Sequence, residues 1–452
     1  MRVHFIAIGG AAMHNMAIAL HLKGFQVTGS DDEIFDPSKS RLAKHGLLPE
    51  NYGWFPEKIN NQIDAIILGM HARPDNPELL EAQKQGLKIY SYPEYIYEQS
   101  KNKLRVVIGG SHGKTSITAM VLHVLNKLEM DFDYMVGAQL EGFETMVKLS
   151  DAPMIILEGD EYLSSPIDRR PKFLWYKPQF AVLTGIAWDH INVFPTFENY
   201  VEQFEEFVNT IEEGGYLFYY EGDKNLQSIA YKQNKINCVP YAALKNTIEN
   251  GKTFVFDNEG EKYPIEVFGE HNLQNLHAAK HICFQLGISE RAFFESIQDF
   301  TGAAKRLEKI WDSETFKAYK DFAHSPSKLT ATINAVKAQY PNKKLIAAVE
   351  LHTFSSLNKK FLSEYNGSMQ QADIAAVYYS PEVIAHKKLE PIAPSEIEAA
   401  FQKEGLNVFT VSKDIKGFLE AQEVENAVLL LMSSGNFGGI NLEEFVEQMV
   451  AH

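Results

Sequence analysis

The amino-acid sequence predicts an α/β protein with three successive domains, each built on a mainly parallel sheet. Short β-rich runs alternate with segments of helical periodicity along most of the 452 residues, a pattern typical of βαβ units. Two of these runs end in glycine-rich turns that lead straight into a helix, the order found where α/β sheets bind anionic ligands. The length is enough for two to four domains of about 100–200 residues each.

The composition excludes several classes of protein. Hydrophobic residues make up 45% of the chain and charged residues 23%, which disfavours bulk disorder. The net charge of -16 disfavours general binding to nucleic acids. Cys238 and Cys283 are too few for a disulfide framework or a cysteine-rich zinc site. Because no apolar run approaches about 18 residues, we expect a cytoplasmic protein without a membrane partner.

The first 100 residues predict a Rossmann-like domain. A strand is expected at residues 3–10, a helix at 11–24 and a second strand at 25–32, which together form one βαβ unit. Two further β-rich runs, DAIILGM and LKIYSY, extend the same sheet. The polar stretch at residues 97–103 then predicts a linker, so the first domain is placed at residues 1–100.

The remaining chain predicts two more α/β domains, at residues 101–303 and 304–452. In the first of these, one strand leads into the glycine-rich turn GGSHGKTS, and two later strands end in the polar runs EGDE and AWDH. A junction is expected in FTGAAKRLEKIWD, residues 300–312. Beyond it, helical segments alternate with four β-rich runs, KAYKDFA, KKLIAAVEL, IAAVYYS and AVLLLMSSG.

The turn at residues 9–13 is a candidate anion site. It would direct backbone N–H groups and the positive end of a helix dipole at a ligand. Its glycine spacing does not complete the dinucleotide fingerprint, but Asp31 follows the next strand, where an acidic residue can meet a ribose. A glycine turn with a capping aspartate explains the same residues equally well, so both interpretations stay open.

The stretch RVVIGGSHGKTS, residues 105–116, predicts a phosphate-binding loop of unusual form. The general pattern requires a glycine where Ile108 stands. Lys114 and Thr115 nevertheless follow a strand and glycines, and precede the amphipathic segment SITAMVLHVLNKL. Such a loop wraps phosphates with backbone amides, places an ammonium on the outer phosphates and offers a hydroxyl to Mg²⁺. This order favours a phosphate site over a chance Gly-Lys-Thr turn.

Carboxylates follow two strands of the same domain. Glu158, Asp160 and Glu161 come after one strand, and Asp189 and His190 come after the next. Hard oxygen ligands are what Mg²⁺ prefers, and ligands gather at the carboxyl ends of parallel strands. A solvated acidic turn and a capping histidine are the plain alternatives for each motif alone. Two such strand ends beside a phosphate loop favour a metal–nucleotide site.

The segment GEHNLQNLHAAKH predicts a helix that begins near His271. Asn272 and Asn275 are three residues apart and share a face, where amides can bind a purine edge while His271 stacks on the ring. Helix capping by asparagine is the common alternative. Further along, Arg306 and Asp321 carry no functional signal on their own.

Taken in order, these motifs resemble those of the Mur ligase superfamily. GSHGKTS is similar to the family's Gly-Thr-x-Gly-Lys-Thr loop, and EGDEY, WDH, GEHNLQNLHAA, KRLE and DFAHSP are similar to its later motifs. The resemblance implies a three-domain fold: an N-terminal Rossmann-like domain, a central P-loop ATPase domain and a C-terminal Rossmann-like domain. It implies an ADP-forming ligase that uses ATP and Mg²⁺.

The N-terminal residues HFIAIGGAAM and GSD are similar to members that act on the lactyl carboxylate of UDP-N-acetylmuramate. One such member adds L-alanine, and another reattaches the peptide L-Ala-γ-D-Glu-meso-diaminopimelate. The runs EGDEY, DRRPKFLWYKP and MSSGNFGGI favour the peptide-adding reaction. The expected partners are therefore small molecules, and the expected oligomeric state is a monomer or a weak homodimer.

The resemblance also implies a role for each matching residue. The expected catalytic residues are Lys114, Glu158 and His190, and the expected metal ligands are Thr115, Glu158 and His190. The expected ATP-binding residues are Gly110, Ser111, His112, Gly113, Lys114, Thr115, Ser116, His271, Asn272, Asn275, Arg306 and Asp321. The expected contacts to the UDP substrate are Gly9, Gly10, Ala11, Ala12, Met13, Ser30 and Asp31. His324 and His352 are expected on the acceptor side.

Several positions depart from the family pattern. Gly185 stands where the family has asparagine, Leu163 where aspartate is usual, and Ser325 where histidine is frequent. The helix VEQFEEFV has no lysine to carry a carbamoyl group, and HTFSSLN lacks the expected arginines. These departures keep alternatives open: the L-alanine ligase, and a nucleotide-binding scaffold without ligase activity. An NAD-linked dehydrogenase explains only the first βαβ unit.

Overall fold

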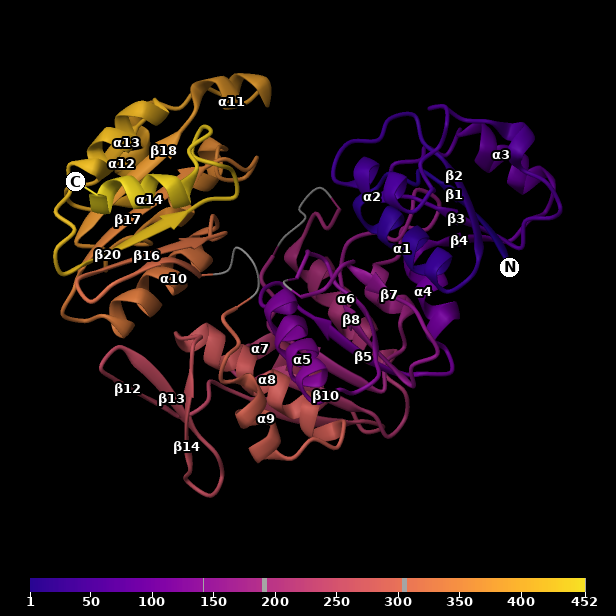
Figure 1. The fold of residues 1–452 in the computed structure, drawn as a ribbon, viewed down its shortest axis with the longest axis horizontal. Helices are drawn as coiled ribbons and strands as arrows, with labels where there is room; N and C mark the ends of the chain where they lie inside the picture. The colour runs from indigo at the N-terminus through magenta and orange to yellow at the C-terminus, as the bar shows by residue number, and fades with distance from the viewer. Residues whose placement is uncertain (141, 189–192, 303–306, 452) are drawn as a thin grey trace. The chain divides into compact units, whose positions relative to one another are not determined.

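The computed structural model describes residues 1–140, 142–188, 193–302 and 307–451. The chain divides into two compact units, Met1–Ala242 with Gln274–Ser296, and Ala243–Leu273 with Ile297–His452. Figure 1 shows helices and sheets in alternation along the chain, as expected for an α/β protein. In the described ranges, no helix combines the length and the apolarity needed to cross a membrane.

The N-terminal part of the first unit is a four-stranded parallel sheet in the order β2-β1-β3-β4. Its strands are β1 (Arg2–Ile6), β2 (Gln26–Ser30), β3 (Ala65–Leu68) and β4 (Ile89–Ser91). Its helices are α1 (Ala11–Leu22), α2 (Ser38–Lys44), η1 (Pro56–Lys58), α3 (Pro77–Lys84) and α4 (Tyr92–Ser100). Alternate side chains of β1 bury toward opposite faces, Phe5 with α1 and α4 and Ile6 with α3. The predicted βαβ unit is confirmed.

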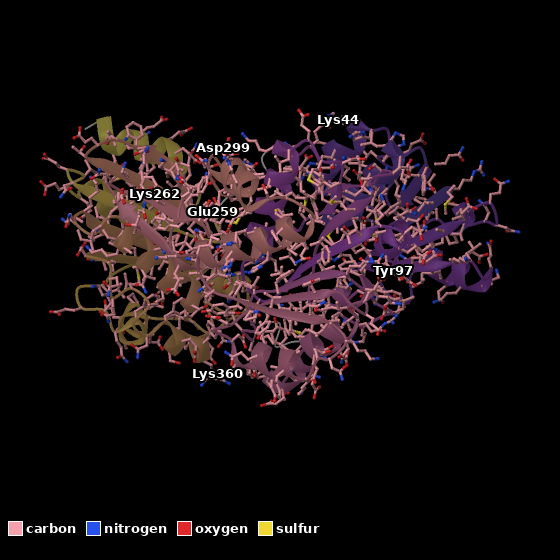
Figure 2. All side chains as sticks on the ribbon, turned by 90° about the horizontal axis from the view of Figure 1, so that it is seen from below. Lys44, Tyr97, Glu259, Lys262, Asp299 and Lys360 are labelled. Carbon is pink, nitrogen blue, oxygen red and sulfur yellow. The ribbon has the colours of Figure 1, made fainter. Side chains whose placement is uncertain are left out.

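The predicted linker at residues 97–103 is mostly helical. A capping box between Ser91 and Glu94 starts α4, which continues to Ser100. The ring of Tyr97, labelled in Figure 2, lies 5.4 Å from the Arg105 guanidinium. Arg105, buried in the next strand, donates hydrogen bonds to the carbonyls of Ser100, Lys101 and Lys103 at 2.9–3.0 Å. These contacts fix the short turn after α4, and the polar composition alone did not reveal them.

The central part of the first unit is a seven-stranded sheet in the order β11-β10-β9-β5-β8-β6-β7, parallel except for β7. Its strands are β5 (Leu104–Gly109), β6 (Asp133–Met135), β7 (Val147–Lys148), β8 (Met154–Glu158), β9 (Phe180–Leu183), β10 (Tyr216–Tyr220) and β11 (Asn237–Tyr241). Its helices are α5 (Lys114–Lys127), η2 (Lys172–Trp175), α6 (Phe197–Asn209), α7 (Lys224–Tyr231), α8 (Glu270–Gln285) and α9 (Glu290–Ile297). Helices α6 and α7 join the core on one face, and His281 of α8 stacks on Phe218 of β10.

The second unit is built on a six-stranded sheet in the order β15-β16-β20-β17-β18-β19, in which only β15 is antiparallel to its neighbour. Its strands are β15 (Glu308–Asp312), β16 (Phe316–Asp321), β17 (Lys344–Leu351), β18 (Ile374–Tyr379), β19 (Asn407–Phe409) and β20 (Ala427–Met432). Its helices are α10 (Pro326–Gln339), η3 (Lys359–Tyr365), α11 (Pro381–His386), α12 (Pro394–Phe401), α13 (Ser412–Glu420) and α14 (Leu442–Ala451). The junction predicted at residues 300–312 therefore includes an edge strand.

The period of two along β17 divides the core of this sheet between its two faces. Val349 faces α10, η3, α11 and α12, whereas Ala348 faces α13 and α14. A separate antiparallel sheet comprises β12 (Asn246–Glu249), β13 (Lys252–Phe256) and β14 (Lys262–Ile265). It forms the thin ribbon seen in Figure 1. Long charged side chains such as Lys44 and Lys360 lie exposed on the surface in Figure 2.

Candidate nucleotide-binding site

The glycine-rich loop joins β5 to α5 and is closely packed. Gly113 has φ +84°, and a side chain there would place its Cβ 2.5 Å from Oδ1 of Asn275. The Ser111 N–H donates to the Gly185 carbonyl at 3.0 Å, and the Ser111 hydroxyl accepts from the Ala187 N–H at 2.8 Å. The loop is therefore held in one path between β5 and the segment that follows β9. Ile108, which stands where the general phosphate-loop pattern has a glycine, is fully buried in β5. It is therefore a residue of the strand and not of the loop.

Lys114 begins α5 and is held by two oxygens. Its Nζ donates to the Gly110 carbonyl at 2.7 Å and to Oε2 of Glu161 at 2.8 Å. Burial alone would lower the pKa of Lys114, but the carboxylates of Glu161 and Asp160 raise it above its usual value. The lysine is therefore charged and curled back over its own loop, where a phosphate can replace Glu161 as its partner.

Thr115 and Glu158 form a second pair of oxygen donors beside this lysine. The Thr115 hydroxyl donates to Oε1 of Glu158 at 2.9 Å, and the Gly137 N–H donates to Oε2 at 2.8 Å. Thr115 lies in the first turn of α5, directly after the loop that follows β5, and Glu158 is the last residue of the adjacent strand β8. One hydroxyl and one carboxylate are hard oxygen ligands, so they fit Mg²⁺. In the described part of the chain, no group of three or more His, Cys, Asp or Glu side chains is arranged so that it could hold a metal ion.

The other carboxylates after β8 are paired differently. Asp160 accepts from Lys172 Nζ at 2.5 Å and from the Tyr162 N–H at 3.2 Å. Burial would raise the pKa of Asp160, but Lys172 and Lys114 hold it below its usual value. The site therefore carries both cations and carboxylates, which suits the transfer of a charged phosphoryl group.

Tyr200 of α6 also reaches the site, which sequence reasoning missed. Its hydroxyl donates to Oε1 of Glu161 at 2.9 Å and lies 3.2 Å from the Ser111 hydroxyl. This helix has no lysine, and its Glu205 pairs with Lys232. The N-cap Thr196 sets the start of α6, and the sequence offers no signal that distinguishes Tyr200 from a core tyrosine of this helix.

Two departures from the family pattern have a local explanation. Gly185 has φ +135°, a region that only glycine adopts readily, so the segment after β9 follows a path that asparagine would strain. Leu163 is buried and forms a β-bridge with Pro171. Ser325 begins α10, yet its buried hydroxyl neither caps the helix nor makes another hydrogen bond.

The predicted residues that are described in the second unit lie at the start of α8 and at or after the ends of β16 and β17. Asn272 donates to the Phe268 carbonyl at 2.9 Å, and burial lowers the pKa of His271 to about 4. Asp321 ends β16 and accepts from the Ala323 N–H at 2.7 Å, and His324 Nδ1 lies 2.8 Å from the Phe322 carbonyl. His352 follows β17. Arg306, Asp189 and His190 lie outside the described residues.

The N-terminal turn brings together the residues predicted to bind the UDP substrate. Asp31 accepts from the Gly9 N–H at 2.7 Å, and the Ser30 carbonyl accepts from two N–H groups that follow β1. Gly10 caps α1, whose Ala11 and Ala12 are exposed whereas Met13 is buried. Burial raises the pKa of Asp31 to about 6, against the opposing hydrogen bond from Gly9. The hydroxyl of Ser30 is buried without a hydrogen bond.

Comparison with protein families gives two adjoining matches. Residues 2–103 match the model described as the Mur ligase family, catalytic domain, and residues 108–283 match the Mur ligase middle domain. The chain belongs to the Mur ligase family. Members of this family are ATP-dependent, ADP-forming ligases of peptidoglycan synthesis, so the predicted family, enzyme class and nucleotide are confirmed for this ligase.

Individual relatives agree with this assignment. The chain is 28% identical over 453 residues to a UDP-N-acetylmuramate–L-alanine ligase of Clostridium acetobutylicum, covering 96% of this chain and 95% of the relative. Its fold is similar to a murein peptide ligase from Psychrobacter arcticus, with a TM-score of 0.63, 20% identity and coverage of 100% and 98%. It is also similar to a UDP-N-acetylmuramate–alanine ligase from Thermotoga maritima, with a TM-score of 0.69, 21% identity and coverage of 100% and 99%. These folds confirm the predicted three-domain α/β architecture.

Proposed function

We propose that this Mur ligase joins the peptide L-Ala-γ-D-Glu-meso-diaminopimelate to the lactyl carboxylate of UDP-N-acetylmuramate. The observation that carries the ligase chemistry is the arrangement at the ends of β5 and β8. There the charged Lys114 donates a hydrogen bond to Glu161, and the Thr115 hydroxyl donates one to Glu158. This arrangement supports the activation of a carboxylate by ATP.

The proposed reaction has two steps. A carboxylate is a poor electrophile, so the γ-phosphoryl group of ATP is first transferred to it, giving an acyl phosphate and ADP. The N–H groups of the loop and the Nζ of Lys114 hold the phosphates and stabilise the charge that moves during transfer. The neutral amine of the peptide then attacks the acyl carbon, and phosphate leaves from the tetrahedral intermediate. The product is an amide bond.

Mg²⁺ would be held by Thr115, Glu158 and His190, and when bound it neutralises charge on the phosphates. We assign adenine binding to His271, Asn272 and Asn275, and further nucleotide contacts to Arg306 and Asp321. Asn275 supports this role because its side chain is buried directly against the phosphate loop at Gly113.

The remaining assignments concern the two other substrates. We place the UDP part of the substrate at the N-terminal turn, where Gly9 and Asp31 are hydrogen-bonded. We place the acceptor beside His324 and His352 in the second unit. Both follow strands of the six-stranded sheet, at the edge where ligands of open α/β sheets bind.

The segment after β8 supports a peptide acceptor over L-alanine. The segment DRRPKFLWYKP, residues 168–178, is similar to peptide-adding members of the family, and its side chains contact one another. Asp168 accepts from Trp175 Nε1 at 3.0 Å, and the Arg170 guanidinium lies 4.2 Å from the centre of the Trp175 ring. A second candidate, the addition of L-alanine, is favoured by the names of the curated relatives at 27–28% identity.

An acceptor screen tests this proposal. Purified protein is incubated with ATP, Mg²⁺ and UDP-N-acetylmuramate, and phosphate release is measured with L-alanine, with L-Ala-γ-D-Glu and with tripeptides. We expect release to require all components and to be fastest with the tripeptide. Equal or faster turnover with L-alanine would establish the second candidate. ATP binding without product from any acceptor would contradict both.

A further inference from the structure

The six-stranded sheet of the second unit has a topological switch point between β17 and β20. After β17 the chain passes through η3 to β18 on the face covered by α10. After β20 it passes to α14 on the opposite face. Adjacent parallel strands whose connections diverge in this way open a binding crevice at their carboxyl ends. A ligand of this unit is therefore expected where the loops after β17 and β20 meet.

A buried carboxylate lies at this point. Glu350, near the end of β17, is 3% exposed. Its Oε2 accepts from the Phe437 N–H at 2.8 Å and from the Ser433 hydroxyl, both in the loop after β20. Its Oε1 makes no hydrogen bond, and Nδ1 of His352 lies 3.7 Å away. Throughout the residues described, no Lys or Arg forms an ion pair with Glu350.

The surroundings of Oε1 are polar and tightly built. A Cβ on Gly435 would lie 2.7 Å from Oε2 of Glu350 and 2.9 Å from Cγ of His352, so the loop passes directly over the pair. The hydroxyl of Ser434, in the same loop, is buried without a hydrogen bond. A buried carboxylate without a cation costs free energy, which a positively charged ligand would recover. The imidazole of His352 and the hydroxyl of Ser434 add further acceptors for such a ligand.

We propose that Glu350, His352 and the loop 433–437 bind an ammonium group of the acceptor. This inference rests on the proposed function. The amine that attacks an acyl phosphate must be neutral, whereas a carboxylate stabilises the protonated form. The group bound at Glu350 is therefore a second amino group, remote from the reacting amine. The site thus selects acceptors that end in a diamino acid, and it needs no arginine after β17.

Paired peptides and variants test the site. The acceptors are L-Ala-γ-D-Glu-meso-diaminopimelate and the same peptide with hydrogen in place of the distal amino group. Each is used with the wild-type enzyme, with Glu350→Gln and with the control Glu382→Gln, an exposed carboxylate on α11. Glutamine at position 350 can still accept from Ser433 and Phe437, so the loop is expected to keep its fold. We measure kcat/KM, and peptide binding by calorimetry.

We expect removal of the distal amino group to lower kcat/KM at least 10-fold in the wild type and in Glu382→Gln. Glu350→Gln should treat the two peptides alike. A preference that persists in Glu350→Gln, or a wild type that ignores the amino group, would overturn the inference and leave the proposed ligase intact. If the wild type ligates neither peptide, the proposed function fails. The calorimetric preference for the amino group, and its loss in Glu350→Gln, still decides the inference.

Discussion

Two turns of the first unit share one local structure and differ in charge. The turn after β1 and the loop after β5 both pass from a buried strand through glycines into a helix. The loop after β5 holds Lys114, which pairs with Glu161. The turn after β1 instead holds the carboxylate of Asp31, which accepts from Gly9 and forms no ion pair with any Lys or Arg of the described residues.

On the proposed assignments, the helix N-terminus alone does not decide which ligand a turn binds. Both turns lead into the N-terminus of a helix, but Lys114 adds the charge that suits a triphosphate. In the N-terminal turn Asp31 occupies one N–H and offers acceptor oxygens, which suits hydroxyl and N–H groups of a nucleoside. Variants in the two turns should therefore affect different substrates.

The largest expected effect comes from Lys114→Ala. Removal of the ammonium should lower turnover by about three orders of magnitude or more, because charge on the transferred phosphoryl group then lacks its main protein partner. Binding of UDP-N-acetylmuramate should stay nearly unchanged. Single-turnover kinetics and calorimetry measure the two effects.

Lys127→Ala, at the other end of α5, is the matched control and should keep full activity. Near-normal ligation by Lys114→Ala would refute the proposal that this loop binds the phosphates of ATP.

Glu158→Gln should have the next largest effect, a loss of about 100-fold in turnover together with a higher requirement for Mg²⁺. The amide keeps the size of the side chain and can still accept from Thr115, so the loss reports the missing charge. Turnover is measured across a range of Mg²⁺ concentrations. A variant with an unchanged Mg²⁺ dependence would show that Glu158 is not a metal ligand.

Local sequence patterns were sufficient to predict the strands on either side of the candidate site and the position of the phosphate loop, whereas β6, β7, β10 to β15 and β19 were not predicted. β5 and β8 end within a residue or two of the predicted strand ends, because buried apolar runs followed by glycine leave few alternatives. The pairing of Lys114 with Glu161 was not predictable, because it depends on how two strand ends approach in space.

Long-range contacts explain what the sequence did not reveal. Tyr200 resembles any core tyrosine of an amphipathic helix, and only the docking of α6 brings its hydroxyl to Glu161. Glu350 lies within an apolar strand, and its meeting with Ser433 joins residues 83 positions apart. Patterns of period two or 3.6 do not contain such contacts.

Adding a single methyl group to either turn, by a Gly→Ala substitution, should have a smaller effect, and each substitution should impair a different substrate. Gly9→Ala would place its Cβ 2.9 Å from Oδ2 of Asp31, so we expect KM for UDP-N-acetylmuramate to rise about 10-fold while ATP binding is kept. Gly113→Ala would strain a positive φ and press on Asn275, so we expect the reverse pattern. Steady-state kinetics with each substrate varied in turn provide the measurement. If both variants impair the same substrate, the two turns do not have separate ligands.

The smallest effect concerns stability and the charge of Asp31. Burial raises the pKa of Asp31 to about 6 in the folded protein, above about 4 in the unfolded chain. The unfolded state therefore loses this proton first, and stability falls as the pH rises from about 4 to about 6, then levels off. Asp31→Asn cannot ionise and still accepts from Gly9, so it escapes this loss, which is at most about 3 kcal/mol.

The melting temperature of Asp31→Asn relative to wild type should therefore increase between pH 4 and pH 7. The exposed Asp75→Asn is the control and should show a flat difference, because Asp75 is 72% exposed and only loosely paired with Arg73. If the melting temperature of Asp31→Asn relative to wild type is constant or decreases as the pH rises, the turn stabilises the ionised carboxylate of Asp31. The N-terminal turn would then behave like the loop after β5, and the contrast between the two turns would not hold.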